Sequence, residues 1–218
     1  KGSDGSSYSS SSSSGKGTWR ADVISGPFKE PPSKETCAAV RICVQELIQP
    51  VLKQMEAWTN DERCQAASTL HTLIILGQDA VVTSESLPRV LQALMKHVSD
   101  LEDPSYPKVC QTLRTIGCLL PVGSWIEHTL RSLQTNAEGG HSAWLVLLNE
   151  MVKGTPKGSL FPYMLKLSRV LSRCSIALSE DRPTRFFARA AMTSLLLHYD
   201  NNNSSAAGGG GAAPTAAG

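Results

Sequence analysis

The side chains best spaced for binding chemistry are six basic residues near the C-terminal end of the sequence. They are Lys166, Arg169 and Arg173 on one predicted helix and Arg182, Arg185 and Arg189 on the next. Because residues three and four apart share a helical face, each set forms a basic stripe. A solvated helix face is the ordinary interpretation of such a stripe. The alternative is that one stripe docks an acidic segment of a partner protein. The second stripe is the better candidate, because second helices line the concave side of most helical solenoids.

Nucleic acid is a poorer ligand for these stripes. Phe186 and Phe187 are the only aromatic residues among the arginines of the second stripe, and we expect them in the core, where they could not stack on bases. The whole chain has a formal net charge of +2, so no overall field attracts nucleic acid or an anionic membrane. Any charge-driven binding must therefore be local.

The sequence carries no pattern typical of a catalytic, nucleotide or metal site. The histidines are scattered over different predicted helices, without HxxxH or HExxH spacing, at positions His71, His97, His128, His141 and His198. Cys110 and Cys118 lie roughly two turns apart on one predicted helix, where core packing explains them. Single glycines such as Gly77, Gly117 and Gly154 fit helix C-terminal caps and form no phosphate-binding loop. We therefore predict no enzyme activity, no cofactor and no metal.

The composition suits a helical core. Hydrophobic residues make up 41% of the chain but aromatic residues only 6%, which favours Leu, Val, Ile and Ala packing. No apolar run approaches the roughly 20 residues that cross a bilayer. The six cysteines show no CxxC pairing and read as reduced thiols. We therefore expect a soluble cytoplasmic protein. Because the sequence opens with Lys1 and shows no leader there, we also expect it to be a fragment of a longer protein.

Low-complexity segments flank a central region. Residues 1–33 contain the serine run Ser9–Ser14 and several prolines, and residues 200–218 are rich in Asn, Ala and Gly. Neither segment can offset its ordering entropy by burying apolar surface. We therefore predict disordered tails at 1–33 and 200–218 around a folded domain at 34–199. Trp19 and Phe28 are the exceptions, because a lone aromatic side chain can dock on a neighbouring domain or a partner.

Apolar residues in the central region recur with helical spacing. The first set is Val40, Val44, Leu47, Val51, Met55 and Trp58, whose steps of three and four define one helical face. Pro50 interrupts it, and because a proline inside a helix costs about 3 kcal/mol, Pro50 is predicted to begin a new helix. Pro88, Pro121 and Pro162 follow at intervals of about 40 residues, and each is likewise predicted to lie at the start of a helix.

Each interval between these prolines has room for two helices. After a lone helix at 34–48, the predicted pairs are 50–58 with 62–77, 86–99 with 104–119, 124–134 with 141–152, and 160–178 with 182–199. Asp61 is the expected N-cap of the second helix of the first pair. Paired helices with this period predict an all-α, HEAT or armadillo type solenoid of about four hairpins plus one leading helix. A closed helical bundle is the alternative. In the solenoid, Leu70, Leu113 and Leu148 should be buried between repeats.

Several segments resemble a known family. The spacing of Asp61, Arg63, Ala66 and Leu70 resembles the second helix of a HEAT repeat. Further segments resemble the C-terminal half of the HEAT-repeat dynein axonemal assembly factor: residues 49–58, 87–95, 122–133 and 142–148. The resemblance extends over about residues 34–199. The serine tract and the Asn/Ala/Gly tail depart from the family pattern.

The resemblance implies a function in protein assembly. It implies a cytoplasmic, non-enzymatic scaffold or co-chaperone-like factor that preassembles axonemal dynein arms for motile cilia. The expected partners are then axonemal dynein chains, chaperones or other assembly factors, without nucleic acid or membrane. It also implies that the acidic residue and Arg63 lie in the turn within a repeat. The alternatives are a karyopherin-like or other HEAT-repeat adaptor, and a tubulin-binding HEAT domain. Against tubulin, the loops at 59–60 and 99–103 lack an aromatic and basic pair.

Overall fold

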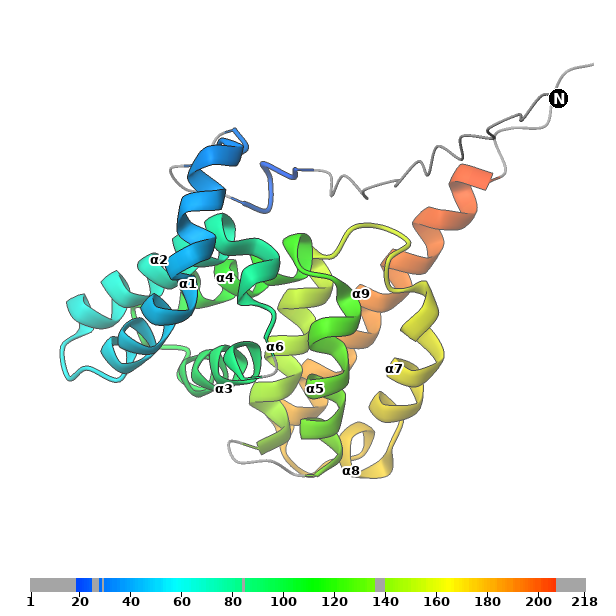
Figure 1. Ribbon diagram of the computed structural model, residues 1–218. Coiled ribbons are helices and arrows are strands. Elements are labelled where there is room, and N and C mark those ends of the chain that lie inside the picture. Colours follow the sequence, from blue (N-terminus) through cyan, green and yellow to red (C-terminus); the bar gives the residue numbers. More distant parts are fainter. Residues whose placement is uncertain (1–18, 25–27, 29, 84, 136–139, 207–218) are drawn as a thin grey trace, which may run out of the picture.

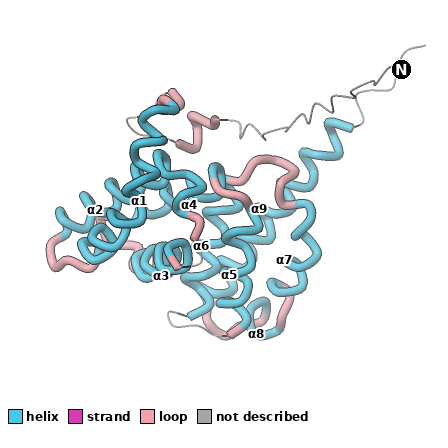
Figure 2. The backbone as a smooth tube through the Cα atoms, viewed as in Figure 1, coloured by secondary structure: helices cyan, strands magenta, loops and turns pink. Residues whose placement is uncertain are grey.

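In the part of the chain that the computed structural model describes, all regular structure is helical. The structure describes residues 19–24, 28, 30–83, 85–135 and 140–206 (Figure 1). The α-helices are α1 (Lys34–Met55), α2 (Asn60–Gly77), α3 (Ser86–Val98), α4 (Tyr106–Leu119), α5 (Val122–Gln134), α6 (Gly140–Gly154), α7 (Met164–Leu171), α8 (Cys174–Ala177) and α9 (Arg182–Ala206). Two 3₁₀ turns, η1 (Gln78–Val81) and η2 (Phe161–Tyr163), complete the elements. Within these ranges there is no strand (Figure 2), which confirms the prediction of an all-α fold.

The helices form two layers. The helices α1, α3, α5 and α7 follow one another in the first layer, and α2, α4, α6 and α9 follow one another in the second, where the contacts between neighbours are much more extensive. The helices α1 and α9 lie at different ends of the row (Figure 1). This arrangement confirms a HEAT-type solenoid. The hairpins are α1 with α2, α3 with α4, α5 with α6, and α7 and α8 with α9.

Helix α1 runs through Pro50, so the predicted break at this residue is wrong. The residues on both sides of the proline belong to one buried face, which packs against α2: Val44, Ile48, Val51, Leu52 and Met55. Pro50 itself is exposed, so its missing hydrogen bond lies on the outer side of the helix. The burial of this face outweighs the local cost of about 3 kcal/mol. The lone leading helix and the short first helix of the first pair are therefore one element.

The same helix corrects the predicted apolar face. Leu47 is exposed, and Ile48 occupies the buried position expected for it. Trp58 lies beyond the end of α1 and is 97% exposed. Thr59, rather than Asp61, caps α2: its Oγ1 accepts a hydrogen bond from the Glu62 backbone N–H at 3.3 Å and donates one to Glu62 Oε2 at 2.7 Å. The Thr59 hydroxyl thus satisfies one of the free backbone N–H groups of the first turn and orients the Glu62 carboxylate, which fixes the start of α2.

The predicted helix 160–178 is divided into η2, α7 and α8. Leu171 and Ile176 are both buried. In one straight helix, two residues five apart would point about 140° away from each other. The turn at Ser172 and Arg173, where the Ser172 N–H donates to Ser168 O, lets both side chains face the core. At the other end of this hairpin, α9 extends to Ala206, beyond the predicted end at 199.

The two central helices of the second layer, α4 and α6, approach at backbone distance. A Cβ atom on Gly117 would lie 2.0 Å from Met151 O, and one on Gly154 would lie 1.9 Å from Arg114 O. The two contacts are reciprocal between the same two helices. Gly117 lies inside α4, so its prediction as a helix cap is wrong: it is needed for close packing.

The predicted core leucines are buried. Leu70, Leu113 and Leu148 have no exposed surface and belong to one continuous core that runs through both layers. Phe187 packs partly against this core, as expected. Phe186 does not, because it is 66% exposed.

Part of the N-terminal segment packs on the solenoid. Val23 and Ile24 are buried together with Ile75 of α2 and Cys118 of α4. Trp19 and Phe28 lie against the same cluster, so these aromatic residues dock on the chain's own repeats. Residues 19–24 are therefore in contact with the folded region, although the sequence places them in a disordered tail. The domain boundaries at 33 and 200 remain predictions, and residues 1–18 and 207–218 lie outside the described part.

A buried histidine makes the stability of this fold pH-dependent. His71 Nε2 lies 3.0 Å from Thr115 Oγ1, and Thr115 Oγ1 donates its own hydrogen to Gln111 O at 3.0 Å. His71 Nε2 must therefore carry the donated hydrogen. His71 Nδ1 is buried and has no hydrogen-bond partner within the described residues, so a proton there would be unsatisfied. Burial, together with the positive charge of Lys108, lowers the pKa of His71 to about 4.

We expect the free energy of unfolding to decrease as the pH falls from about 6.5 towards 4. The unfolded chain takes up a proton on His71 near pH 6.5 and the folded chain only near 4. At pH 5 this difference costs about 2 kcal/mol. Urea denaturation at pH 7 and pH 5 should show this extra loss in the wild type relative to His71→Gln. An equal pH dependence in both proteins would contradict the assignment.

Candidate partner-binding surface

The last hairpin contains a hollow with apolar walls and basic side chains. Its volume is about 280 Å³, and its lining comes from three helices and the turn after α7: Leu171, Ser172, Ala177, Arg185, Ala188, Arg189 and Met192. We call it the α7–α9 hollow. Leu171, Ala177, Ala188 and Met192 give it an apolar interior, while the two arginines supply positive charge. An apolar side chain flanked by a carboxylate is the chemistry that fits such a site.

The start of α9 fixes the position of these arginines. Asp181 Oδ2 accepts hydrogen bonds from the Thr184 backbone N–H at 2.9 Å and from Thr184 Oγ1 at 2.5 Å. These bonds lower the pKa of Asp181, so the carboxylate stays charged beside the positive end of the helix. Arg185 is half-buried, and its Nη1 donates to Ser179 O. The guanidinium of Arg185 is therefore held in place before any partner arrives.

The six basic residues of the predicted stripes have different surroundings in the structure. Lys166 Nζ forms an ion pair with Glu127 of α5 at 2.5 Å, so its charge is already partly neutralised. Arg169, Arg173 and Arg182 are exposed and do not line the hollow. Only Arg185 and Arg189 come together in it, and within the described residues Arg189 has no ion pair.

The basic stripes predicted from the sequence do not include the apolar residues that line the α7–α9 hollow. Ala188 lies three residues after Arg185 and Met192 three residues after Arg189, so the helical spacing could have shown that they share the site. Leu171 and Ala177 could not be assigned to it, because the break between α7 and α8 was not predicted. Exposed Phe186 adds a large apolar side chain on the same helix, in an edge-to-face contact with Phe187 at 5.2 Å.

Burial makes the two cysteines of α4 weak nucleophiles. Cys37, Cys110 and Cys118 are buried, and all five cysteines whose side chains are described are free thiols. Burial raises the pKa of Cys110 and of Cys118, which keeps both as weakly nucleophilic thiols. In the described part of the chain, no group of three His, Cys, Asp or Glu side chains is arranged to hold a metal ion.

The loop between α1 and α2 differs from the prediction. The sequence was expected to lack an aromatic and basic pair at the loops between paired helices, yet Trp58 opens this loop and is almost fully exposed. Lys53 lies in the last turn of α1, five residues before Trp58. The prediction that Trp58 belongs to a buried helical face is therefore wrong. The prediction failed because Trp58 was assigned to the buried face of a helix that ends at Met55.

Comparison with known proteins identifies the family. A family model described as the HEAT-repeat domain of dynein axonemal assembly factor 5 matches residues 32–206. The chain belongs to this family. The match begins just before α1 and ends with α9, so it covers all four hairpins seen in the described residues of this chain. Membership of the family supports a role in axonemal dynein assembly.

No curated protein and no solved structure matches the chain. None of the helices in the described residues is long and apolar enough to cross a membrane. Arg63 lies in the first turn of α2, and its side chain donates hydrogen bonds to Ala57 O and Trp58 O in the turn between α1 and α2. Ala66 and Ala67 are fully buried, which fits the HEAT motif's close helix approach.

Proposed function

We propose that the chain is a non-enzymatic scaffold in the cytoplasmic preassembly of axonemal dynein arms for motile cilia. The match of residues 32–206 to the dynein axonemal assembly factor 5 HEAT domain is the observation that carries this proposal. The two-layer solenoid supports it, because stacked repeats present an extended surface to large protein partners. Its partners are then axonemal dynein chains, chaperones or other assembly factors.

The proposal is tested by loss and replacement of the full-length protein in cells that build motile cilia. Loss should leave immotile cilia whose axonemes lack dynein arms, while transport by cytoplasmic dynein continues. Normal dynein arms in the absence of the protein would overturn it. Binding to a small GTPase with release of a bound partner would instead support a karyopherin-like adaptor.

We further propose that the α7–α9 hollow holds an acidic, partly apolar segment of a partner. The triple variant Arg182→Glu, Arg185→Glu and Arg189→Glu should bind axonemal dynein heavy chains more weakly. Their co-precipitation with the full-length protein at low salt should fall by roughly tenfold. The physical reason is that the two arginines of the hollow change from attracting to repelling a carboxylate. Pull-down at matched expression measures the loss, and circular dichroism should show unchanged helical content.

Arg182→Glu alone is the matched control for that experiment. Arg182 is exposed on the same helix and carries the same charge, but it does not line the hollow. The single variant should retain most of the binding. If it loses as much binding as the triple variant, the effect comes from the general charge of α9. Undiminished binding by the triple variant would remove the hollow from the interaction.

A further inference from the structure

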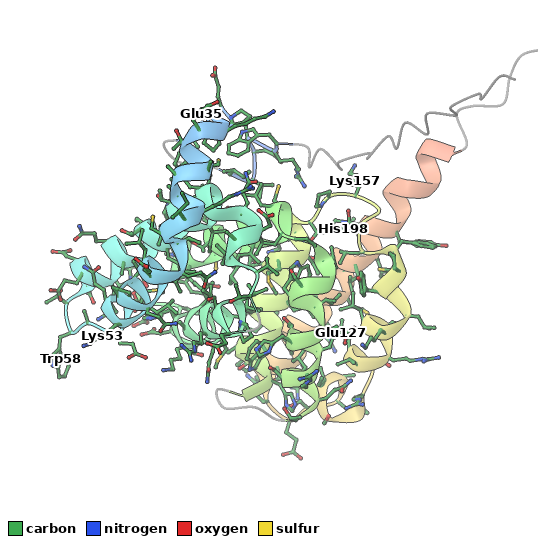
Figure 3. The ribbon with its side chains drawn as sticks, in the orientation of Figure 1. Glu35, Lys53, Trp58, Glu127, Lys157 and His198 are labelled. Carbon is green, nitrogen blue, oxygen red and sulfur yellow. The ribbon has the colours of Figure 1, made fainter. Side chains whose placement is uncertain are left out.

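A second surface lies at the other end of the solenoid, between the C-terminal half of α1 and the helix α3. It is a groove of about 290 Å³, with Leu52 and Ala93 as its apolar floor and Gln49 and Gln92 as amide side chains in its wall. We call it the α1–α3 groove. It shares no residue with the α7–α9 hollow. Lys53 lines the groove in the last turn of α1, Trp58 follows five residues later, and Figure 3 shows both at this end of the protein, away from Lys157 and His198.

The charge of the groove is positive. Its charged lining residues are Lys53, Arg89, Lys96 and Glu56. Lys96 Nζ and Glu56 Oε1 form an ion pair at 2.9 Å, which joins α3 to α1 and lowers the pKa of Glu56. Lys53 and Arg89 are exposed and have no ion pair with any described residue. Two unneutralised cations, one from each helix, therefore face an occupant of the groove.

The loop that carries Trp58 is held rigidly although the side chain is free. Arg63 Nη1 donates to Ala57 O at 3.1 Å and to Trp58 O at 3.0 Å, and its Nε donates to Asp103 Oδ2 at 3.1 Å. The side chains of Arg63 and Asp103 are mostly buried, so this ion pair is shielded from solvent. One arginine thus fixes the backbone on both sides of the Trp58 peptide. The indole is presented to solvent without a flexible loop that would have to be ordered on binding.

An exposed tryptophan on a fixed backbone is a costly feature for a protein surface. Tryptophan buries more apolar area on association than most side chains, and it is enriched among the residues that contribute most to binding. A preorganised loop lowers the entropy lost when a partner is bound. The other tryptophans differ, because Trp125 and Trp144 are buried and Trp19 packs on the N-terminal cluster.

We propose that the α1–α3 groove and Trp58 together bind an extended acidic segment of another protein. Carboxylates of the segment pair with Lys53 and Arg89, and an apolar or aromatic side chain of the segment packs on the Trp58 indole. The side-chain amides of Gln49 and Gln92 hydrogen-bond the backbone of the segment. This surface gives the scaffold a second attachment point, separate from the α7–α9 hollow.

The test uses the full chain and a panel of dye-labelled synthetic 12-residue peptides, each with several Glu residues and one Phe at varied positions. A control panel has Lys in place of Glu. Fluorescence anisotropy at low salt should show that acidic peptides bind and that basic ones do not. Lys53→Glu combined with Arg89→Glu should weaken the best acidic peptide by at least about tenfold, and Trp58→Ala by a similar factor. Both variants change exposed side chains, so circular dichroism should remain that of the wild type.

Two matched variants make the result specific. Arg131→Glu reverses an exposed charge on α5, away from the groove, and should leave peptide binding unchanged. Arg185→Glu with Arg189→Glu should also leave it unchanged, because those residues belong to the other surface. The proposal is overturned if no acidic peptide binds more tightly than about 100 μM, or if Trp58→Ala and the groove variant bind like the wild type. If only the Arg185 and Arg189 variant loses peptide binding, the peptides bind in the α7–α9 hollow and not in the α1–α3 groove. That result would overturn this proposal and leave the proposed scaffold function unaffected.

Discussion

Gly117→Ala should lower the free energy of unfolding by about 3 kcal/mol, the upper part of the range for an overpacked core. The added methyl group would lie 2.0 Å from Met151 O, which is a backbone atom and cannot rotate away. The helices α4 and α6 must therefore separate, and the core between them loses contacts. For a domain of this size, the melting temperature should fall by roughly 6–12 °C. Gly154→Ala should have a similar effect, because its Cβ would meet Arg114 O from the other helix.

Gly123→Ala is the matched control for these two substitutions. A Cβ atom at Gly123 would lie 2.8 Å from the Tyr163 hydroxyl, which is the far end of a side chain that can move. We expect it to change the free energy of unfolding by less than about 1 kcal/mol. Thermal melting followed by circular dichroism compares the three variants. If Gly117→Ala melts like Gly123→Ala, the two helix backbones do not touch as described.

Leu113→Asp should unfold at least the middle of the array. Leu113 on α4 is completely buried, and removing a buried leucine side chain alone costs about 2–5 kcal/mol. An unpaired carboxylate in the same place adds several kcal/mol more. The total is comparable to the whole stability of an ordinary domain, which is about 5–15 kcal/mol. Circular dichroism should show a large loss of helix at room temperature, and hydrogen exchange should show the loss of protection centred on α4.

Leu101→Asp provides the comparison for Leu113→Asp. Leu101 is the same residue type in the connection between α3 and α4, but it is 62% exposed. The same substitution there should leave helical content and melting temperature nearly unchanged. Equal melting temperatures for the two variants would mean that the assigned register of α4 is wrong.

The helix pairs were predictable because they depend on local patterns. Apolar residues at steps of three and four are visible in the sequence, and α3, α4, α5 and α6 lie within a few residues of their predicted bounds. Pro50 shows the limit of such local reasoning. Its unfavourable effect on a helix is a property of the residue alone, whereas the packing of Val44, Ile48 and Val51 on α2 exists only in the folded protein.

The candidate surfaces were only partly predictable. The spacing of Arg185 and Arg189 identified them, but the hollow beside them depends on the break after Leu171, which has no sequence signal such as Gly or Pro. The α1–α3 groove unites residues about 40 positions apart, one repeat period, and nothing in either helix alone indicates it. Trp58 was misassigned for a related reason, since its apolar character suited a helical face that ends before it.

The glycine contact between α4 and α6 also determines how the protein should respond to a mechanical load. The neighbouring junctions include side-chain contacts, such as His71 with Thr115 between α2 and α4 and Ser194 with Asn149 between α6 and α9, and side chains can change rotamer when the array bends. At Gly117 and Gly154 the main chains touch, so no compliant layer exists there. When a large client pulls on the two ends, we expect curvature to change at the junctions of α2 with α4 and of α6 with α9, while the central junction moves as a rigid block.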